Sequence, residues 1–115
     1  MNESLRLYPS APLDHKVSVS EDILPDGSKI DKSDVVVYNI FAMGRSKDIW
    51  GDDADEFKPE RWLNKYAPSS YSYPVFNAGP RECIGKRLAL VEMKPCLVNI
   101  MYSILLFWCS VSAGA

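Results

Sequence analysis

The first nine residues, "MNESLRLYP", place charged and apolar positions at helical spacing. Glu3 and Arg6 are three positions apart, so a helix would carry both of them on one face. Pro9 lacks a backbone N–H and clashes with a continued turn, and it therefore ends the element. The pattern predicts a short helix that already runs at residue 1.

Two segments with strand character follow. Apolar and polar residues alternate over residues 15–20, which groups Val17 and Val19 on one face, as in a half-buried strand. Residues 34–40 are rich in β-branched side chains, which favour strands. Residues 24–28, "LPDGS", have the proline and glycine of a tight turn. We expect the two strands to form a hairpin or to be neighbours in a small sheet.

Residues 41–75 are polar and are interrupted by proline and glycine. We expect a short helix from Ala42 to Lys47, followed by a coil that winds over a surface with its aromatic side chains turned inward. The aromatic residues concerned include Trp50, Phe57 and Trp62.

The last part of the chain predicts a helix of five turns or more over residues 85–108, with Pro95 interrupting the pattern. Within residues 96–109 only Asn99 and Ser103 are polar, so the segment is either a short membrane segment or a helix buried in a larger protein. The buried helix is favoured, because the run is shorter than the roughly 20 apolar residues that a membrane span needs.

Composition limits the fold and the class of partner. A chain of 115 residues is the size of one small domain, and 47% hydrophobic residues argue against disorder. Residues 1–62 contain thirteen acidic and eight basic residues, a net charge of −5, and residues 63–115 contain two acidic and five basic residues, a net charge of +3. This asymmetry is too weak to indicate a nucleic-acid partner.

The cysteines exclude two common uses of this residue. The three cysteines form no C-x-x-C pair, and His15 is the single histidine, so the sequence contains no zinc-binding motif; the cysteines are Cys83, Cys96 and Cys109. An odd number of thiols without a signal peptide argues against a disulfide framework and predicts a reducing, intracellular environment. Because their neighbours are apolar, Cys96 and Cys109 are expected to be small buried hydrophobes.

Cys83 differs, because it directly precedes the predicted long helix, whose unpaired N–H groups favour an anionic thiolate. A nucleophilic cysteine would need a base, and the only histidine is far away in sequence. A soft metal held by one thiolate, with its other ligands supplied by a macrocycle, fits better, and haem iron is such a metal. The neighbours that add positive charge or let the backbone turn tightly are Arg81, Lys86, Arg87, Gly79 and Gly85.

Residues 76–85, "FNAGPRECIG", have the pattern Phe76-x-x-Gly79-x-Arg81-x-Cys83-x-Gly85. This pattern resembles the haem-binding loop of the cytochrome P450 haem-thiolate monooxygenases. Two further motifs precede it in the order expected for that family. Glu-x-x-Arg at residues 3–6 resembles the motif of the family's helix K, and residues 59–62, "PERW", resemble its "PERF" element. The resemblance covers about residues 1–105.

The resemblance implies a role for each residue of the loop. Cys83 would be the axial ligand of the iron of haem b, and its thiolate would donate electron density that favours cleavage of the O–O bond of dioxygen. Arg81 would pair with a haem propionate, and Phe76 would pack beside the sulfur. Lys16 or His15 would reach the second propionate.

The resemblance also assigns residues outside the loop. Glu3, Arg6 and Arg61 would form a buried structural triad that fixes the coil before the cysteine loop. Residues that would line the substrate pocket are Ala11, Pro12 and Leu13. An electron donor, NADPH–cytochrome P450 reductase or a similar protein, would dock near Lys86 and Arg87.

The implied fold is mainly α with a small β-sheet: the C-terminal portion of the cytochrome P450 fold, as one partial domain over residues 1–115. Its elements would be a helix, a β-hairpin, a meander coil, the cysteine loop and a long helix. Several segments resemble the eukaryotic fatty-acid ω-hydroxylases. The expected reaction is therefore insertion of one oxygen atom of dioxygen into a lipophilic small molecule, with ω-hydroxylation of a fatty acid as the first hypothesis.

We expect the chain to be an incomplete piece of such a protein. The family's distal acid–alcohol pair usually contains threonine, and this chain has no threonine, so no catalytic residue is assigned within it. A complete parent would be anchored in the endoplasmic reticulum membrane. The alternative hypothesis is a truncated, inactive product with at most loose haem or membrane binding.

Overall fold

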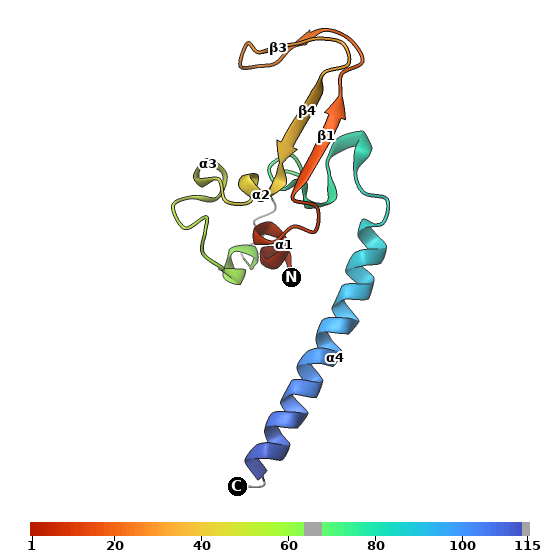
Figure 1. The fold of residues 1–115 in the computed structure, drawn as a ribbon. Coiled ribbons are helices and arrows are strands. Elements are labelled where there is room, and N and C mark those ends of the chain that lie inside the picture. Colours follow the sequence, from red (N-terminus) through yellow and green to blue (C-terminus); the bar gives the residue numbers. More distant parts are fainter. Residues whose placement is uncertain (64–67, 114–115) are drawn as a thin grey trace. The chain divides into compact units, whose positions relative to one another are not determined.

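The computed structural model describes residues 1–63 and 68–113, which group into two compact units, Met1–Gly79 and Pro80–Ala115. Among the described residues, the first unit contains the strands and three short α-helices, and the second contains one long α-helix (Figure 1). The predicted small antiparallel sheet and the long helix near the C-terminus are both present.

The predicted first helix is present as α1, Asn2–Leu7, and it ends before Pro9. Arg45 donates a hydrogen bond of 2.6 Å to the carbonyl of Leu7, which would otherwise be an unpaired acceptor at the helix end. The guanidinium of Arg45 also lies 3.7 Å from the ring centroid of Phe41. The sequence pattern did not single out Arg45.

The strands form two nested antiparallel pairs (Figure 1). β1, Leu13–Val17, pairs with β4, Val35–Asn39, so that Leu13 lies opposite Asn39. Between them β2, Asp22–Ile23, pairs with β3, Lys29–Ile30. The predicted turn joins β2 to β3, and Gly27 within it has a φ of 87°. The two predicted strands, β1 and β4, are neighbours in a sheet.

The predicted buried face of the first strand is wrong. Val17 is 56% exposed and Val19 is 86% exposed, whereas Asp14 and Tyr38, on the other face of the β1–β4 pair, are half-buried. A two-stranded ribbon has no covered face until another layer packs on it. Alternation along a strand gives the period, but the neighbouring layer decides which face is buried.

The predicted helix from Ala42 to Lys47 is replaced by two single turns, α2, Ile40–Met43, and α3, Lys47–Trp50. The break contains Gly44, which lies against the backbone of α1. A Cβ atom at Gly44 would lie 2.1 Å from the carbonyl oxygen of Arg6, so only glycine fits at this contact.

Two of the three aromatic residues predicted to turn inward do so, one at the end of α3 and one in the coil that follows it. Trp50 is buried and Trp62 is half-buried, and their ring centroids are 5.9 Å apart. The ring of Tyr73 completes the cluster, at 6.0 Å from Trp50 and 5.1 Å from Trp62. Phe57 is 56% exposed, so its predicted burial is wrong.

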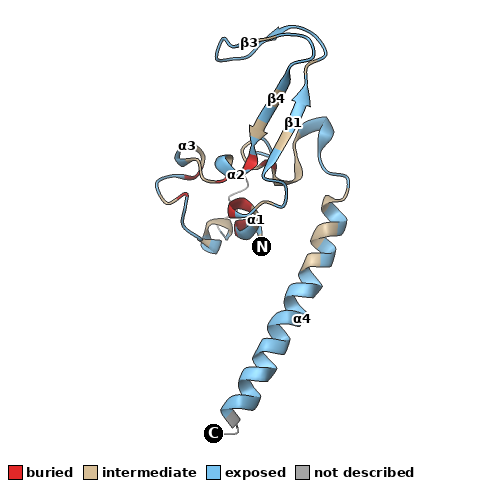
Figure 2. Cartoon of the chain, in the orientation of Figure 1, coloured by how far each residue is buried: buried red, intermediate tan, exposed pale blue. Residues whose placement is uncertain are grey.

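A buried ion pair lies at the centre of this unit, where Figure 2 shows the buried residues of α1. Glu3 and Arg6 are 1% and 0% exposed, and Arg6 holds the carboxylate with two hydrogen bonds of 2.7 and 2.9 Å. The three remaining hydrogen bonds of the guanidinium reach the backbone carbonyls of Gly44, Ala54 and Glu56. All five N–H donors of this arginine are therefore used.

The Glu3 carboxylate accepts further hydrogen bonds from the coil. The backbone N–H of Lys58 donates at 3.0 Å and the indole N–H of Trp62 donates at 2.9 Å. Burial alone would raise the pKa of Glu3, but the hydrogen bonds from Arg6, Lys58 and Trp62 lower it to about 2. The carboxylate is thus ionised at neutral pH and ties α1 to the coil.

Arg61 joins the same group from η1, a single 3₁₀ turn over Pro59–Trp62. Its Nε lies 3.7 Å from Glu3 Oε1, and its Nη atoms donate to the carbonyl of Trp50 and to the carboxylate of Asp53, both at 2.9 Å. The structure therefore brings together the three side chains of the proposed triad. Hydrogen bonds from Lys58 and then Arg61 lower the pKa of Asp53 to about 2.

The second unit is dominated by α4, Lys86–Ala113, which continues through Pro95 without a break. Every described side chain from residue 94 to residue 112 is exposed (Figure 2). Cys96 and Cys109 are therefore exposed, which contradicts the prediction that they are buried. Their apolar neighbours lie along the same helix and do not cover them.

The depressed pKa of Glu3 predicts a loss of stability in acid. Its folded pKa of about 2 lies below the ordinary value of 4.5, so its contribution is complete above about pH 5 and is lost as the pH falls towards 2. The shift corresponds to about 3 kcal/mol. Urea unfolding at pH 7, 5, 4 and 3, followed by tryptophan fluorescence, measures this loss.

The matched variants for this test are Glu3→Gln and Asp53→Asn. Glu3→Gln leaves the Arg6 charge buried without a counter-charge, and we expect a destabilisation of about 3–5 kcal/mol at pH 7 and a flatter dependence on pH. Asp53 is more exposed, so Asp53→Asn retains most of the acid sensitivity. An equal loss of acid sensitivity in the two variants would contradict the central role of Glu3.

The close approach at Gly44 predicts that Gly44→Ala destabilises the first unit by about 3 kcal/mol or more, because the new methyl group would lie 2.1 Å from the carbonyl oxygen of Arg6. Gly27→Ala is the control: its φ of 87° disfavours a side chain, but no atom lies within 4 Å, so we expect a cost of about 1–2 kcal/mol. Unfolding midpoints in urea compare the two. Gly44 has an ordinary helical φ of −64°, so similar losses would show that the neighbouring backbone moves aside and that the contact with Arg6 does not require glycine.

Candidate functional site

Cys83 lies in the short segment that leads into α4. Its carbonyl accepts a hydrogen bond of 3.2 Å from the N–H of Lys86, the first residue of the helix, and its thiol is exposed. A Cβ atom at Gly85 would lie 3.8 Å from the sulfur, so the glycine leaves that flank of the sulfur free of a side chain. The thiol therefore sits at the positive end of a helix dipole, with open space for a flat ligand.

The chemistry of the available donors limits which metal centre Cys83 can serve. Among the described residues, no group of three or more histidine, cysteine, aspartate or glutamate side chains is placed to hold a metal ion. One exposed cysteine suits a metal whose other ligands belong to a cofactor. Haem iron brings four ring nitrogens of its own, so the residues present fit a haem.

The basic residues around Cys83 differ in how they are placed. Arg81 belongs to η3, a 3₁₀ turn over Gly79–Arg81, and its side chain is exposed. Lys86 is hydrogen-bonded to the Glu82 carboxylate one helical turn earlier, so part of its charge is neutralised locally. Arg87 is exposed at the start of α4. The positive charge predicted around the thiol is thus partly balanced by Glu82.

The first half of the loop belongs to the first unit. Phe76 is the last residue of η2, a 3₁₀ turn over Pro74–Phe76, and it is half-buried. Gly79 has a φ of 63°, and a Cβ atom there would lie 2.8 Å from the hydroxyl of Tyr71. Glycine is therefore favoured at this position both by the backbone and by the neighbouring ring.

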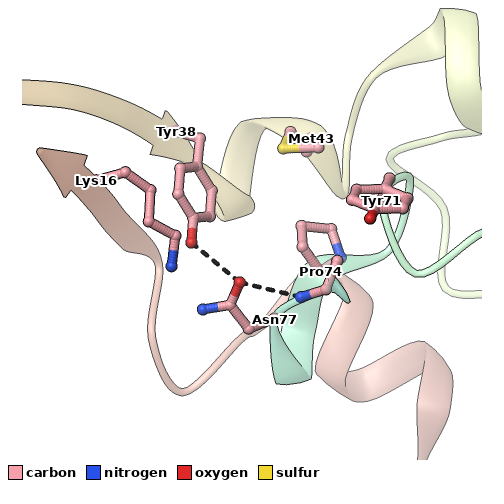
Figure 3. Close-up of a pocket in the computed structure, with 7 residues that line it drawn as sticks. Lys16, Tyr38, Met43, Tyr71, Pro74 and Asn77 are labelled. Atoms are coloured by element: carbon pink, nitrogen blue, oxygen red, sulfur yellow. Dashed lines mark hydrogen bonds between the residues drawn. The ribbon is translucent and has the colours of Figure 1, made fainter. Parts of the chain in front are cut away.

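Asn77 ties the start of the loop to the sheet, as Figure 3 shows. Its amide donates a hydrogen bond of 2.8 Å to Asp14, and its carbonyl oxygen accepts one of 3.0 Å from the N–H of Ala78. The Tyr38 hydroxyl donates to Asp14 at 2.6 Å and lies 3.2 Å from the same Asn77 oxygen. Hydrogen bonds from Tyr38 and then from the His15 amide lower the pKa of Asp14.

Sequence reasoning missed this network. Antiparallel pairing places Asp14 opposite Tyr38, which the two strand segments could have indicated. No pattern paired either residue with Asn77, which follows Asp14 by 63 positions. Asn77 has a φ of 63°, a conformation that asparagine tolerates better than most residues, and this preference was the one local signal available.

An apolar pocket of about 270 Å³ adjoins the network (Figure 3). Lys16 borders it with its Nζ 5.8 Å from the ring centroid of Tyr38. His15 points to the other face of β1, because successive strand residues alternate. The lining residues are Lys16, Tyr38, Met43, Tyr71, Pro74, Asn77 and Ala78.

Of the predicted substrate-lining residues, Ala11 and Pro12 lie between α1 and β1, and Leu13 is the first residue of β1. All three are exposed, and the carbonyl of Pro12 accepts a hydrogen bond of 3.1 Å from the N–H of Phe41. Leu13 borders a second, shallow pocket with His15 and Val37. Ala11 and Pro12 line neither this shallow pocket nor the one beside Asn77.

Comparison with known proteins identifies the family. The family model for cytochrome P450 matches residues 1–106. Cytochrome P450 94A1 of Vicia sativa is 48% identical over 110 residues, which cover 88% of this chain and 21% of the relative. Cytochrome P450 94A2 of Vicia sativa is 51% identical over 107 residues, which cover 86% and 21%, respectively.

A third relative, alkane hydroxylase MAH1 of Arabidopsis thaliana, is 44% identical over 106 residues, which cover 88% of this chain and 21% of the relative. The chain thus spans about a fifth of the length of the curated relatives it matches. Proteins of the matched family bind haem b through a cysteine thiolate. Since the match extends over nearly all of the described sequence and includes the cysteine loop, this chain belongs to the cytochrome P450 family.

Proposed function

We propose that this chain is the haem-ligating, proximal part of a cytochrome P450 monooxygenase, with Cys83 as the axial ligand. The observation that carries the proposal is the exposed Cys83 thiol at the start of α4, beside a glycine that leaves one flank of the sulfur open. When bound, a thiolate-ligated haem would supply the activation of dioxygen: with two electrons from a reductase and two protons, one oxygen atom would enter the substrate and the other would leave as water.

The residues of the chain would bind and orient that cofactor. The helix dipole of α4 would stabilise the thiolate form of Cys83, and Gly79 and Gly85 would let the loop backbone approach a flat ring. Phe76 would exclude water beside the sulfur, and Arg81 would pair with one propionate. Asn77, through its hydrogen bonds to Asp14 and Ala78, would hold the start of the loop against the sheet.

For the second propionate we assign Lys16 in preference to His15. Lys16 borders the pocket that also contains Asn77 and Ala78 of the loop, whereas His15 lies on the opposite face of β1. A lysine ammonium is a cation at neutral pH, so it can pair with a propionate without gaining a proton.

Glu3, Arg6 and Arg61 would have a structural role in the proposed enzyme. Their hydrogen bonds fix the coil that precedes the cysteine loop, and they take no part in the chemistry. Arg87 is the better candidate for contact with an electron-donating reductase, because Lys86 is already hydrogen-bonded to Glu82.

The proposed substrate of the whole protein is a lipophilic chain, with ω-hydroxylation of a long-chain fatty acid as the specific reaction. Two observations support this class: the segments that resemble fatty-acid ω-hydroxylases, and a relative named as an alkane hydroxylase. Ala11, Pro12 and Leu13 would line the substrate pocket, and the parent protein would be anchored in the endoplasmic reticulum membrane.

Titration of the purified chain with haem tests the ligand assignment. We expect a thiolate-type Soret band after reduction and addition of carbon monoxide, and its loss in Cys83→Ala. Cys96→Ala is the matched control, because Cys96 is also an exposed thiol, and it should leave the spectrum unchanged. An unchanged spectrum in Cys83→Ala, or the same loss in both variants, would reject Cys83 as the ligand.

The size of the native product tests whether the residues act as part of a complete monooxygenase. An antibody raised against residues 45–62 should detect a band about five times heavier than the 12.9 kDa of this chain, because the aligned segment is 21% of its relatives. A band at 12.9 kDa alone would reject the enzyme for this product, whatever the haem titration shows.

A further inference from the structure

The backbone of Asn77 has a conformation that is normally restricted to glycine. Asparagine tolerates a positive φ better than most residues, but here a φ of 63° is combined with a ψ of −178°. Among the described residues, Ser33, between β3 and β4, is the one other non-glycine residue with a positive φ. Two residues after Asn77 the chain does have glycine, at Gly79, where φ is also 63°. A non-glycine residue keeps such a conformation only where its surroundings hold it.

The side chain of Asn77 is held at both of its polar atoms. Its Nδ2 donates to Asp14 Oδ2 at 2.8 Å, and its Oδ1 accepts from the N–H of Ala78 at 3.0 Å. The Tyr38 hydroxyl donates to the same Asp14 oxygen at 2.6 Å and lies 3.2 Å from Asn77 Oδ1. The backbone of Asn77 therefore cannot relax to a common conformation without breaking hydrogen bonds of its own side chain.

We propose that Asp14 and Tyr38 are positioning residues for the cysteine loop: through the side chain of Asn77, they hold the backbone at residue 77 in a conformation that otherwise needs glycine. The chain enters the loop at this residue, so the conformation sets the direction of the residues that lead to Cys83. The inference rests on the proposed function for the identity of the ligand, and it adds two residues that act through a third.

Tyr38 also connects the loop to Lys16, the cation assigned to the second propionate. Asp14 and Lys16 lie on one face of β1, because residues two apart in a strand share a face, and Tyr38 lies opposite Asp14 on β4. The Nζ of Lys16 is 5.8 Å from the ring centroid of Tyr38, whose hydroxyl contacts Asn77. One tyrosine therefore contacts both the start of the loop and the lysine.

A carboxylate suits position 14 because it accepts on both of its oxygens. Asp14 Oδ1 accepts from the N–H of His15 at 2.7 Å, while Oδ2 accepts from Tyr38 and Asn77. An amide has one acceptor atom, so Asp14→Asn would leave either the His15 N–H or the Asn77 amide facing another donor. Tyr38→Phe would remove one donor and keep the bond between Asn77 and Asp14. We therefore expect Asp14→Asn to have the larger effect.

A double-mutant cycle on the haem-free chain tests the proposal. Asp14→Asn is combined with Asn77→Gly, because glycine adopts the conformation at residue 77 without help from a side chain. The readout is hydrogen exchange of the N–H of residue 77, which donates to the carbonyl of Pro74 at 2.9 Å in a bond that does not use the side chain. We expect Asp14→Asn to accelerate this exchange about tenfold in the natural sequence, but less than about twofold in the Asn77→Gly background.

The same four chains are then loaded with haem, reduced and mixed with carbon monoxide. We expect Asp14→Asn to lower the share of the complex with a thiolate-type Soret band several-fold in the natural sequence and to have little effect in the Asn77→Gly background. The matched control is Asp34→Asn. Asp34 directly precedes β4, and its carboxylate accepts from the N–H of Asp31 at 2.9 Å, so this substitution should leave the exchange at residue 77 and the spectrum unchanged.

Two results would overturn the proposal. An equal effect of Asp14→Asn in both backgrounds would show that Asp14 stabilises the sheet and does not act through residue 77. Equal effects of Asp14→Asn and Asp34→Asn would show that any lost carboxylate of the ribbon loosens the loop. The exchange measurement needs no haem, so a chain that binds no haem would reject the proposed function while the cycle still decides the role of Asp14.

Discussion

The first unit depends on one constraint: the charge and all the N–H donors of the buried Arg6 side chain must be paired. Taking a guanidinium out of water costs several kcal/mol unless its charge and all of its donors are paired. Arg6 meets this condition through the Glu3 carboxylate and three backbone carbonyls, one between α2 and α3 and two in the coil after α3. Lysine has three donors on a single nitrogen and cannot reach the same set, so the arrangement requires arginine. Segments with little regular structure are therefore fixed by hydrogen bonds to one side chain.

This constraint explains which parts of the fold were predictable from the sequence. Glu3, Arg6 and Arg61 are charged residues at recognisable spacings, and the structure brings them together. The carbonyls that complete the arrangement belong to Gly44, Ala54 and Glu56, and a backbone acceptor leaves no trace in residue type. The need for glycine at residue 44 likewise comes from α1, which is distant in sequence. A local pattern therefore predicted one helix where a long-range contact requires a break.

The candidate site likewise has a part that the sequence predicted and a part that it did not. The spacing around Cys83 predicted a ligand loop, because a thiol before a helix and between glycines has a local chemical meaning. The interaction that holds the loop's first half is the Asn77–Asp14–Tyr38 network, which depends on three segments meeting. The burial predicted for Val17, Phe57, Cys96 and Cys109 was wrong for a related reason. Hydrophobic residues predict that a surface will be covered, but the covering layer must exist before they are buried.

The need for a layer that covers apolar residues applies to α4 more than to any other element. A helix that is apolar all round fits equally well in a protein core or in a bilayer, so its sequence alone leaves the surroundings open. The family match includes residues 95–106 of this helix, and the chain spans about a fifth of the length of the curated relatives it matches. The polar first unit and the apolar helix thus need opposite surroundings: the first unit satisfies its charges internally, whereas α4 needs an apolar environment that the described residues do not provide.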